Sequence, residues 1–395
     1  MKWLKWILLP IGIGVSAGSA SALFLASLER VSALQSRYAW LLWLLPIGGA
    51  AVSFIYMKYG KEAIRGNNLV LEQVHSGNGN IPLRMAPLVL FGTLITHLFG
   101  GSAGREGTAV QMSGSLSSAI SRRLGLDDRN RRIAVLCGIG AGFGSVFGTP
   151  IAGAIFGLEA SSRGGQRYQA LLPCLIASFT GHGVTLAWGI KHSHFAIGTL
   201  PPVSWLAVLK VAAAAFAFGL AAALFIHLTA MLKKLFARGF KHPALRSFVG
   251  GIIMIALVYG VGSRDYVGLG LPLMADAFAG ETSPLAFLWK ILFTAVTLGS
   301  GFMGGEVTPL FVIGSALGSA LSPYLALPAA FLAALGLASV FGAASKTPVA
   351  CTILGLELFG VHGALYIMIA CFISAAVSGR TGIYESHVRT YVPKR

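Results

Sequence analysis

The chain has 395 residues, of which 55% are hydrophobic and only 11% are charged, and its mean hydropathy is +0.75. Ordinary soluble domains do not have this composition, so the sequence predicts an all-α polytopic membrane protein. The net charge of +17 is divided among short basic clusters between apolar segments. These clusters lack the interleaved aromatic residues of a nucleic-acid surface, which excludes nucleic acid as a partner.

Apolar stretches follow one another along the whole chain. A full membrane span needs roughly 20 residues, and several stretches are shorter while others are long enough for two partial spans. The 51 glycines that interrupt them predict broken or closely packed helices, as in transporters and channels. The first stretch has the basic start of a signal sequence but no cleavage context, so it is predicted to be the first membrane segment. The stretches cover residues 6–25, 41–56, 87–99, 133–158, 171–188, 203–232, 249–261, 285–302, 309–341 and 348–377.

Two groups of basic residues predict the orientation in the membrane. Under the positive-inside rule such clusters mark cytoplasmic loops. The chain is therefore expected to be a multi-pass membrane protein with these loops on the cytoplasmic side. The groups are Arg122, Arg123, Arg129, Arg131 and Arg132, and Lys233, Lys234, Arg238, Lys241 and Arg246.

Metal and enzyme chemistry find no support in the sequence. The four cysteines lie in apolar stretches without a CxxC pair, and the nine histidines include no HExxH arrangement. An enzyme would need a nucleophile with a positioned base, and neither is found; His97 is interpreted as a helix-packing residue. We therefore predict no metal, no cofactor and no enzymatic activity.

Glu106 is the only carboxylate between residues 100 and 121, a stretch that is otherwise apolar, small or glycine-rich. A carboxyl group at membrane depth is unfavourable as an anion and tolerable as a neutral acid. Such a group can exchange protons or compete with a permeating anion. The alternative, an acid in a solvated turn, is disfavoured because the surrounding sequence offers no polar loop.

The chain also repeats itself. Residues 145–159 (SVFGTPIAGAIFGLE) return as residues 339–357 (SVFGAASKTPVACTILGLE), and residues 104–121 correspond to residues 304–322. Corresponding glycine-interrupted segments in two halves are typical of transporters that bind substrate between the halves. We expect one transmembrane domain, 1–395, with repeat halves at 1–200 and 201–395 and no cytoplasmic regulatory domain.

Three motifs carry a family resemblance. GREGT at residues 104–108 resembles the GREGP motif of the CLC chloride channels and exchangers, and GGEVTP at residues 304–309 resembles their GGIFAP motif. Gly382-Ile383-Tyr384 stands where their pore tyrosine lies. The resemblance runs over nearly the whole chain and implies the CLC fold: an inverted repeat of tilted, partly broken helices. It also implies a homodimer in which each subunit has its own pore.

Departures from the chloride pattern point to one branch of that family. Asn67 replaces the chloride-coordinating serine if the GSGIP motif corresponds to residues 66–70; residues 79–82, which include Asn80, are the rival. Asn67 precedes Glu106 by 39 residues and Asn80 by only 26. The family separates the two motifs by about two segments of roughly 20 residues each, which favours Asn67.

The second group of departures lies in the other motifs. Val307 and Thr308 replace the Phe-Ala pair, Glu306 stands where an apolar residue is usual, and Thr108 replaces the proline of GREGP. Ala160 occupies the place of the internal proton-transfer glutamate. This combination resembles the fluoride/proton antiporters of the family, CLC-F, which export fluoride from bacteria.

The resemblance and the chemistry of fluoride imply roles for these residues. Fluoride is small and strongly hydrated, so it needs several close hydrogen-bond donors, and Asn67, Val307, Thr308 and Tyr384 are expected to line its site. Glu106 would be the gate that also carries the proton. The expected partners are fluoride, protons, the lipid bilayer and a second copy of the chain.

Each assignment has an alternative. Thr308 could bond its own helix carbonyl, Tyr384 could sit in an interfacial aromatic belt, and Asn67 could cap a helix. Glu306 is assigned to the proton path, and its alternative is a structural acid paired with a base such as Lys290. For the whole protein, the alternative is a chloride-selective channel or chloride/proton exchanger.

Overall fold

The computed structural model describes residues 2–76, 81–160, 167–192 and 195–384, and helices make up almost all of this part. The first half contains α1 (Lys2–Arg37), η1 (Ala39–Leu44), α2 (Leu45–Ile55), η2 (Tyr56–Gly60), η3 (Lys61–Arg65), α3 (Asn67–Ser76), α4 (Met85–Leu98), α5 (Glu106–Arg123), α6 (Asp128–Phe147), α7 (Pro150–Ala160) and α8 (Arg167–Ala187). The second contains α9 (Trp205–Gly239), α10 (Pro243–Val261), α11 (Leu271–Ala279), α12 (Ala286–Gly299), α13 (Val307–Leu325), α14 (Ala329–Ser345), α15 (Pro348–Phe359), η4 (Val361–Gly363) and α16 (Ala364–Val377).

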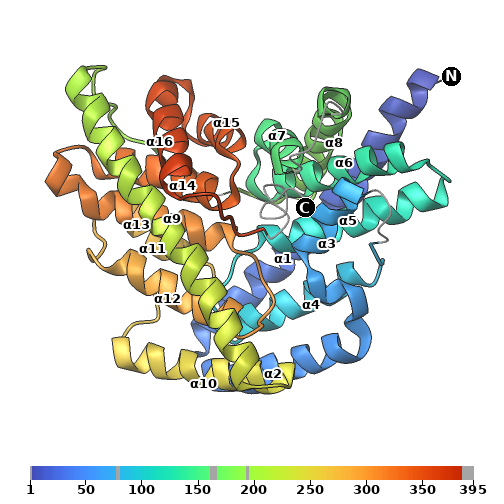
Figure 1. Ribbon diagram of the computed structural model, residues 1–395, viewed down its shortest axis with the longest axis horizontal. Coiled ribbons are helices and arrows are strands. Elements are labelled where there is room, and N and C mark those ends of the chain that lie inside the picture. The colour runs from blue at the N-terminus through green and yellow to red at the C-terminus, as the bar shows by residue number, and fades with distance from the viewer. Residues whose placement is uncertain (1, 77–80, 161–166, 193–194, 385–395) are drawn as a thin grey trace, which may run out of the picture.

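The two halves have matching helices. Long α1 corresponds to long α9, α4 to α12, α5 to α13, α6 to α14 and α7 to α15. Most helices of the first half lie to the right of Figure 1 and most of the second to the left, with α1 and α9 running obliquely through the molecule. The order of helices in the first half thus recurs in the second.

Within the described residues, six helical segments are long and apolar enough to cross a membrane. They include α1, α8, α9, α10 and α13, and the continuous segment Ala39–Val74. Other apolar helices have 10 to 17 residues, such as α7 and α15, and are too short for a full span. The apolar stretch 133–158 is divided between α6 and α7, and 309–341 between α13 and α14, whereas 203–232 lies almost wholly in the single helix α9.

Glycines allow the closest helix crossings. A Cβ atom on Gly18 of α1 would lie 2.5 Å from the carbonyl oxygen of Gly181 in α8, and one on Gly314 of α13 would lie 2.0 Å from that of Gly336 in α14. No larger residue fits at such distances, so these pairs fix how near the backbones come.

Two glutamates tie the repeat halves together through helix ends. Glu159 at the end of α7 accepts hydrogen bonds from the backbone N–H groups of Val349 (3.1 Å) and Ala350 (2.7 Å) at the start of α15. Glu357, near the end of α15, accepts in the same way from Ile151 (2.9 Å) and Ala152 (2.7 Å) of α7. Each carboxylate thus satisfies unpaired donors at the positive end of the partner helix.

Candidate functional site

The N-termini of α5 and α13 meet at the centre of the repeat. The N–H of Gly104 donates to the carbonyl of Gly305 at 2.6 Å, and the N–H of Gly305 donates to the carbonyl of Gly104 at 2.8 Å. A Cβ atom on Gly305 would lie 2.8 Å from the backbone nitrogen of Gly107, so the contact requires glycine. The two signature motifs, far apart in sequence, therefore form one structural unit.

Glu106 is the first residue of α5 and is fully buried against α13. Its Oε2 accepts hydrogen bonds from the N–H of Thr308 at 3.0 Å and of Arg105 at 3.1 Å. Its Oε1 accepts from the hydroxyl of Thr308 at 2.5 Å. A carboxylate held by backbone N–H groups at helix N-termini occupies an anion-binding position.

Arg105 adds positive charge beside this carboxylate. Its Nε lies 3.5 Å from Oε1 of Glu106, and the side chain is 17% exposed whereas that of Glu106 is 0% exposed. The geometry is that of an ion pair without a hydrogen bond at Nε. The position of the carboxylate is thus favourable for a negative charge on three counts: helix ends, a hydroxyl donor and a guanidinium.

Thr308 does not use its hydroxyl on its own helix. The alternative considered from sequence had this hydroxyl bonded to a carbonyl of its helix, but here it donates to Glu106. Thr108 is buried on the other side of the same region and shares a 2.7 Å hydrogen bond with Thr93 of α4. The threonine that replaces the family's proline thus links α5 to α4.

Asn67 lies beside the start of α5. It is the first residue of α3, and its Nδ2 is 2.9 Å from the position that a Cβ on Gly107 would take. Its Oδ1 is buried and has no hydrogen-bond partner within the part of the chain that the structure describes. The rival position, Asn80, lies outside the described residues.

Val307 and Tyr384 are buried near the same helix ends. Val307 is the first residue of α13. The ring of Tyr384 packs edge-on against Phe156 with centroids 6.5 Å apart, and its segment is fixed by a 2.9 Å hydrogen bond from the N–H of Ile383 to the carbonyl of Ala344. Glu106 and Glu306 both lie within electrostatic range of the tyrosine hydroxyl.

Glu306 is the N-cap residue of α13 and is partly buried. Lys233 of α9 is the base that acts on it electrostatically. Lys290 does not pair with it in the described structure, because the Lys290 ammonium donates instead to the carbonyls of Tyr266 (3.1 Å) and Gly268 (3.0 Å). The pairing with Lys290 that was the alternative for Glu306 is therefore wrong, since Lys290 faces the segment that leads into α11.

Lys290 has no role of its own among the predictions from sequence. It is fully buried in α12, and Lys290 and Arg105 both act electrostatically on buried His97, the penultimate residue of α4. Both ring nitrogens of His97 are without a hydrogen-bond partner among the described residues. The sequence does contain a signal for Lys290: it is a single lysine inside the apolar stretch 285–302, and ionisable groups at membrane depth are rare and usually functional.

A small cavity adjoins the gate. It has a volume of about 30 Å³ and is lined by Arg105 and Thr308 together with apolar side chains such as Phe147 and Phe311. This space suffices for one species the size of a water molecule. The donor set around Glu106 therefore lies next to room for a small ion.

Comparisons with known proteins agree with this geometry. The profile of the voltage-gated chloride channel family matches residues 48–379. A chloride/fluoride channel protein of Pseudomonas syringae pv. tomato is 45% identical over 388 residues, which are 97% of this chain and 86% of that protein. The crystal structure of a CLC-type fluoride/proton antiporter superposes with a TM-score of 0.94 at 34% identity, covering 97% of both chains.

A more distant structure extends the likeness of fold. A slow cyanobacterial Cl⁻/H⁺ antiporter superposes with a TM-score of 0.83 at 20% identity and covers 98% of both chains. The motif resemblance, the family profile and the fluoride/proton antiporter structure confirm what the sequence predicted for fold and family. The chain is a polytopic membrane protein of the CLC family of voltage-gated chloride channels.

Proposed function

We propose that this chain is a fluoride/proton antiporter that exports fluoride from the cytoplasm in exchange for protons, with Glu106 as gate and proton carrier. The observation that carries the proposal is the donor set on the Glu106 carboxylate, formed by the Thr308 N–H and hydroxyl and the Arg105 N–H. A similar protein, 45% identical, is named a chloride/fluoride channel, and a structure with 34% identity is a fluoride/proton antiporter.

Competition for these donors explains coupling. A fluoride ion and the Glu106 carboxylate are both anions that seek the same N–H and O–H groups, so they do not share the position. Once the carboxylate is protonated, it loses negative charge and becomes itself a donor. Proton binding to Glu106 therefore releases the site to the anion, and anion departure returns the carboxylate to it.

The kind of donor favours fluoride. A small, strongly hydrated ion gives up its water only where several short hydrogen bonds replace it. The Thr308 hydroxyl makes a 2.5 Å bond to a carboxylate oxygen, which shows that short contacts are accommodated there. We assign Asn67, Val307, Thr308 and Tyr384 to the fluoride path, with the buried amide of Asn67 next to the start of α5.

Glu306 is proposed as part of the proton path. The place of the internal glutamate of chloride/proton exchangers is taken by Ala160, which is fully buried and cannot ionise. Glu306 is a carboxyl group at the start of α13, and Tyr384 lies within electrostatic range of both Glu306 and Glu106. This arrangement supports a route from Glu306 past Tyr384 to the gate.

The membrane potential can drive such an exchange. If one fluoride leaves while one proton enters, two charges cross an inside-negative membrane in the favourable direction. The potential then supplies about 4 to 5 kcal/mol per 100 mV, at roughly 2.3 kcal/mol per charge. We place the protein in the bacterial inner membrane as a homodimer whose subunits work separately, since one chain supplies all the donors described around Glu106.

The test is fluoride efflux from loaded proteoliposomes with simultaneous recording of proton uptake. The natural chain is expected to couple the two, and Glu106→Gln to lose either the transport or the coupling. Glu281→Gln, the same substitution at an exposed position between α11 and α12, serves as the matched control. Proton-independent fluoride flux in both the natural chain and Glu106→Gln would indicate a channel, and chloride flux without fluoride flux would support the chloride alternative.

A further inference from the structure

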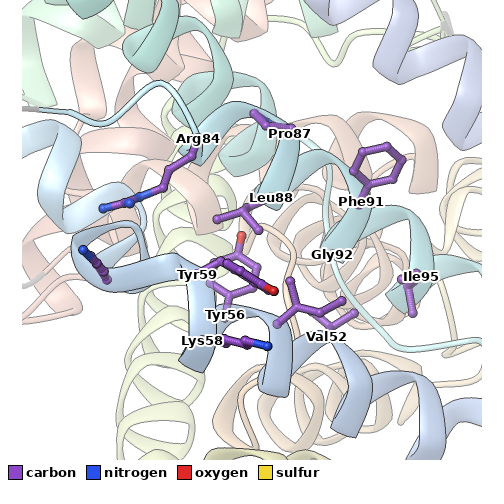
Figure 2. A pocket seen from close by; sticks show the side chains of 12 residues that line it. Val52, Tyr56, Lys58, Tyr59, Arg84, Pro87, Leu88, Phe91, Gly92 and Ile95 are labelled. Carbon is purple, nitrogen blue, oxygen red and sulfur yellow. The ribbon is translucent and has the colours of Figure 1, made fainter.

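A groove opens between α2 with η2 and α4, and none of its lining residues belongs to the site around Glu106. Its volume is about 770 Å³ (Figure 2). One wall carries Val52, Ile55 and Tyr56, and the other carries Leu88, Phe91 and Ile95. These residues recur at intervals of three and four along each helix, so each wall is a single helical face.

One end of this groove is basic. Lys58 and Lys61 on η2 and η3, and Arg84 just before α4, line the groove with Tyr59. Figure 2 shows Arg84 at one end of the α4 wall and Ile95 towards the other. Within the part of the chain that the structure describes, none of the three cations forms an ion pair. The side chain of Lys58 stands over the ring of Tyr59, 5.3 Å from its centroid.

The backbone at the basic end departs from regular helix. η2 is a π-helical turn, and Lys61 follows it with φ of 45°, a left-handed conformation that residues with a side chain seldom adopt. π-helical turns and residues of this kind concentrate at functional positions. Here both features lie where the chain presents cations to the groove.

The groove has the length of one membrane leaflet. From Arg84 to Ile95 the chain advances eleven residues, which is about 16 Å of helix. Half of a hydrocarbon core roughly 30 Å thick is about 15 Å. An occupant with its charge at Arg84 and its apolar part along Leu88, Phe91 and Ile95 would therefore match the depth of a single leaflet.

Two contacts bring the basic end of the groove next to a basic cluster that the positive-inside rule assigns to the cytoplasm. Arg122 donates to the carbonyl of Ile81 at 3.0 Å and to the hydroxyl of Ser118 at 2.7 Å. Ile81 is three residues before Arg84, so the basic cluster at the end of α5 adjoins the basic end of the groove. Clusters of this kind mark cytoplasmic loops, and the cytoplasmic leaflet carries the anionic lipids.

We propose that this groove is a binding site for an anionic phospholipid of the inner leaflet. The phosphate lies among Lys58, Lys61 and Arg84, and an acyl chain lies against Leu88, Phe91 and Ile95. Charge complementarity selects this occupant, since three cations are matched best by a lipid with net negative charge, whereas the choline of a zwitterionic lipid adds a further positive charge beside them. A second cavity, of about 340 Å³, serves as contrast: the described residues that line it are Leu8, Leu9, Gly12, Ile120, Leu124 and Leu126, and none of these six is a cation.

The proposal is tested on the purified full-length protein by native mass spectrometry with added lipid. The probes are phosphatidylglycerol, phosphatidylcholine with the same acyl chains, and glycerol phosphate as a head group without chains. Phosphatidylglycerol is expected to bind more tightly than either of the others. This readout does not depend on which ion the protein transports.

Two variants address the two parts of the site. The triple variant Lys58→Gln, Lys61→Gln, Arg84→Gln is expected to weaken phosphatidylglycerol binding about fivefold per cation, on the order of a hundredfold in all. Leu88→Trp, which fills the apolar trough, is expected to weaken it at least tenfold. Each variant has a matched control. The triple variant Lys234→Gln, Arg238→Gln, Lys241→Gln removes three other exposed cations. Leu9→Trp fills the second cavity.

Four results would overturn the proposal. Equal binding of the two lipids would mean that charge plays no part, and equal losses in the control triple variant would mean that the protein's overall charge decides. Glycerol phosphate binding as tightly as the lipid, with Leu88→Trp unaffected, would indicate a site for free anions. A lipid-independent dimer that the Leu88→Trp substitution dissociates would mean that the groove holds a second copy of the chain. Because unfolded protein appears at higher charge states in native mass spectra, a variant that fails to fold is recognised and is replaced by its single substitutions.

Discussion

Replacing Thr308 with valine tests the idea that fluoride and the Glu106 carboxylate use the same donor. Valine keeps the shape of threonine and the backbone N–H, but removes the hydroxyl that donates to Oε1 of Glu106 at 2.5 Å. A hydrogen bond to a charged group contributes about 1.5 to 3 kcal/mol. If fluoride uses the hydroxyl in the same way, its intrinsic affinity falls about 10- to 150-fold.

The measured loss depends on what competes for the site. With Glu106 present, the substitution weakens the carboxylate and fluoride together, so the two effects partly cancel and the apparent fluoride affinity changes much less. With Glu106→Ala, no carboxylate competes and the full loss is expected. The difference between the two backgrounds is the interaction energy of a double-mutant cycle.

Isothermal titration of fluoride into the four proteins measures these affinities. Thr352→Val is the matched control, because the hydroxyl of Thr352 donates to the carbonyl of Pro348 in its own helix, at 2.8 Å. Equal losses for Thr308→Val in the two backgrounds would refute the shared-donor reasoning. An unchanged affinity in the Glu106→Ala background would show that fluoride does not contact Thr308 at all.

Three further predictions concern the proton path, the repeat contact and the helix caps. Glu306→Gln should abolish proton uptake while fluoride efflux continues, measured in the same proteoliposomes; unchanged coupling would remove Glu306 from the proton path. Gly305→Ala places a Cβ 2.8 Å from the backbone nitrogen of Gly107 and should reduce efflux at least tenfold, and normal efflux would show that the contact yields easily. Glu159→Gln and Glu357→Gln should each lower the unfolding free energy by about 1 to 2 kcal/mol, seen as reduced thermal stability in detergent, because a neutral amide caps a helix less well. If the two losses differ widely, the caps are not equivalent.

Much of the helical architecture could be predicted because lipid imposes a simple rule on composition. The apolar stretches identified in the sequence lie almost wholly in helices, but their lengths did not indicate which of them divide: 203–232 stays in α9, whereas the shorter 133–158 divides between α6 and α7. α5 was not among them, because its many serines and glycines are buried against protein and do not face lipid. The functional role of α5 was predicted from Glu106 and the GREGT motif, and not from hydropathy.

The site was only partly predictable, because contacts between the halves leave no local signal. Glu106 and Thr308 were both expected near the anion, but not the hydrogen bonds between them across 202 positions of the chain. Glu159 and Glu357 exchange helix caps between α7 and α15, a contact that no local pattern in the sequence indicates. Lys290 was considered only as a partner for Glu306, since no pattern indicates a lysine that bonds to two backbone carbonyls.

The paired Gly104–Gly305 hydrogen bonds limit how this molecule can alternate its access. A rocking motion of one half against the other would have to break both bonds at the point where the halves meet. Rotation of the Glu106 side chain breaks only bonds to its own carboxylate and leaves both backbones in place. We therefore expect a transport cycle in which one side chain moves within a nearly fixed scaffold. Distances measured between spin labels on α2 and α9 would then stay constant whether or not fluoride is present, and a shift of several ångströms would show that the scaffold itself moves.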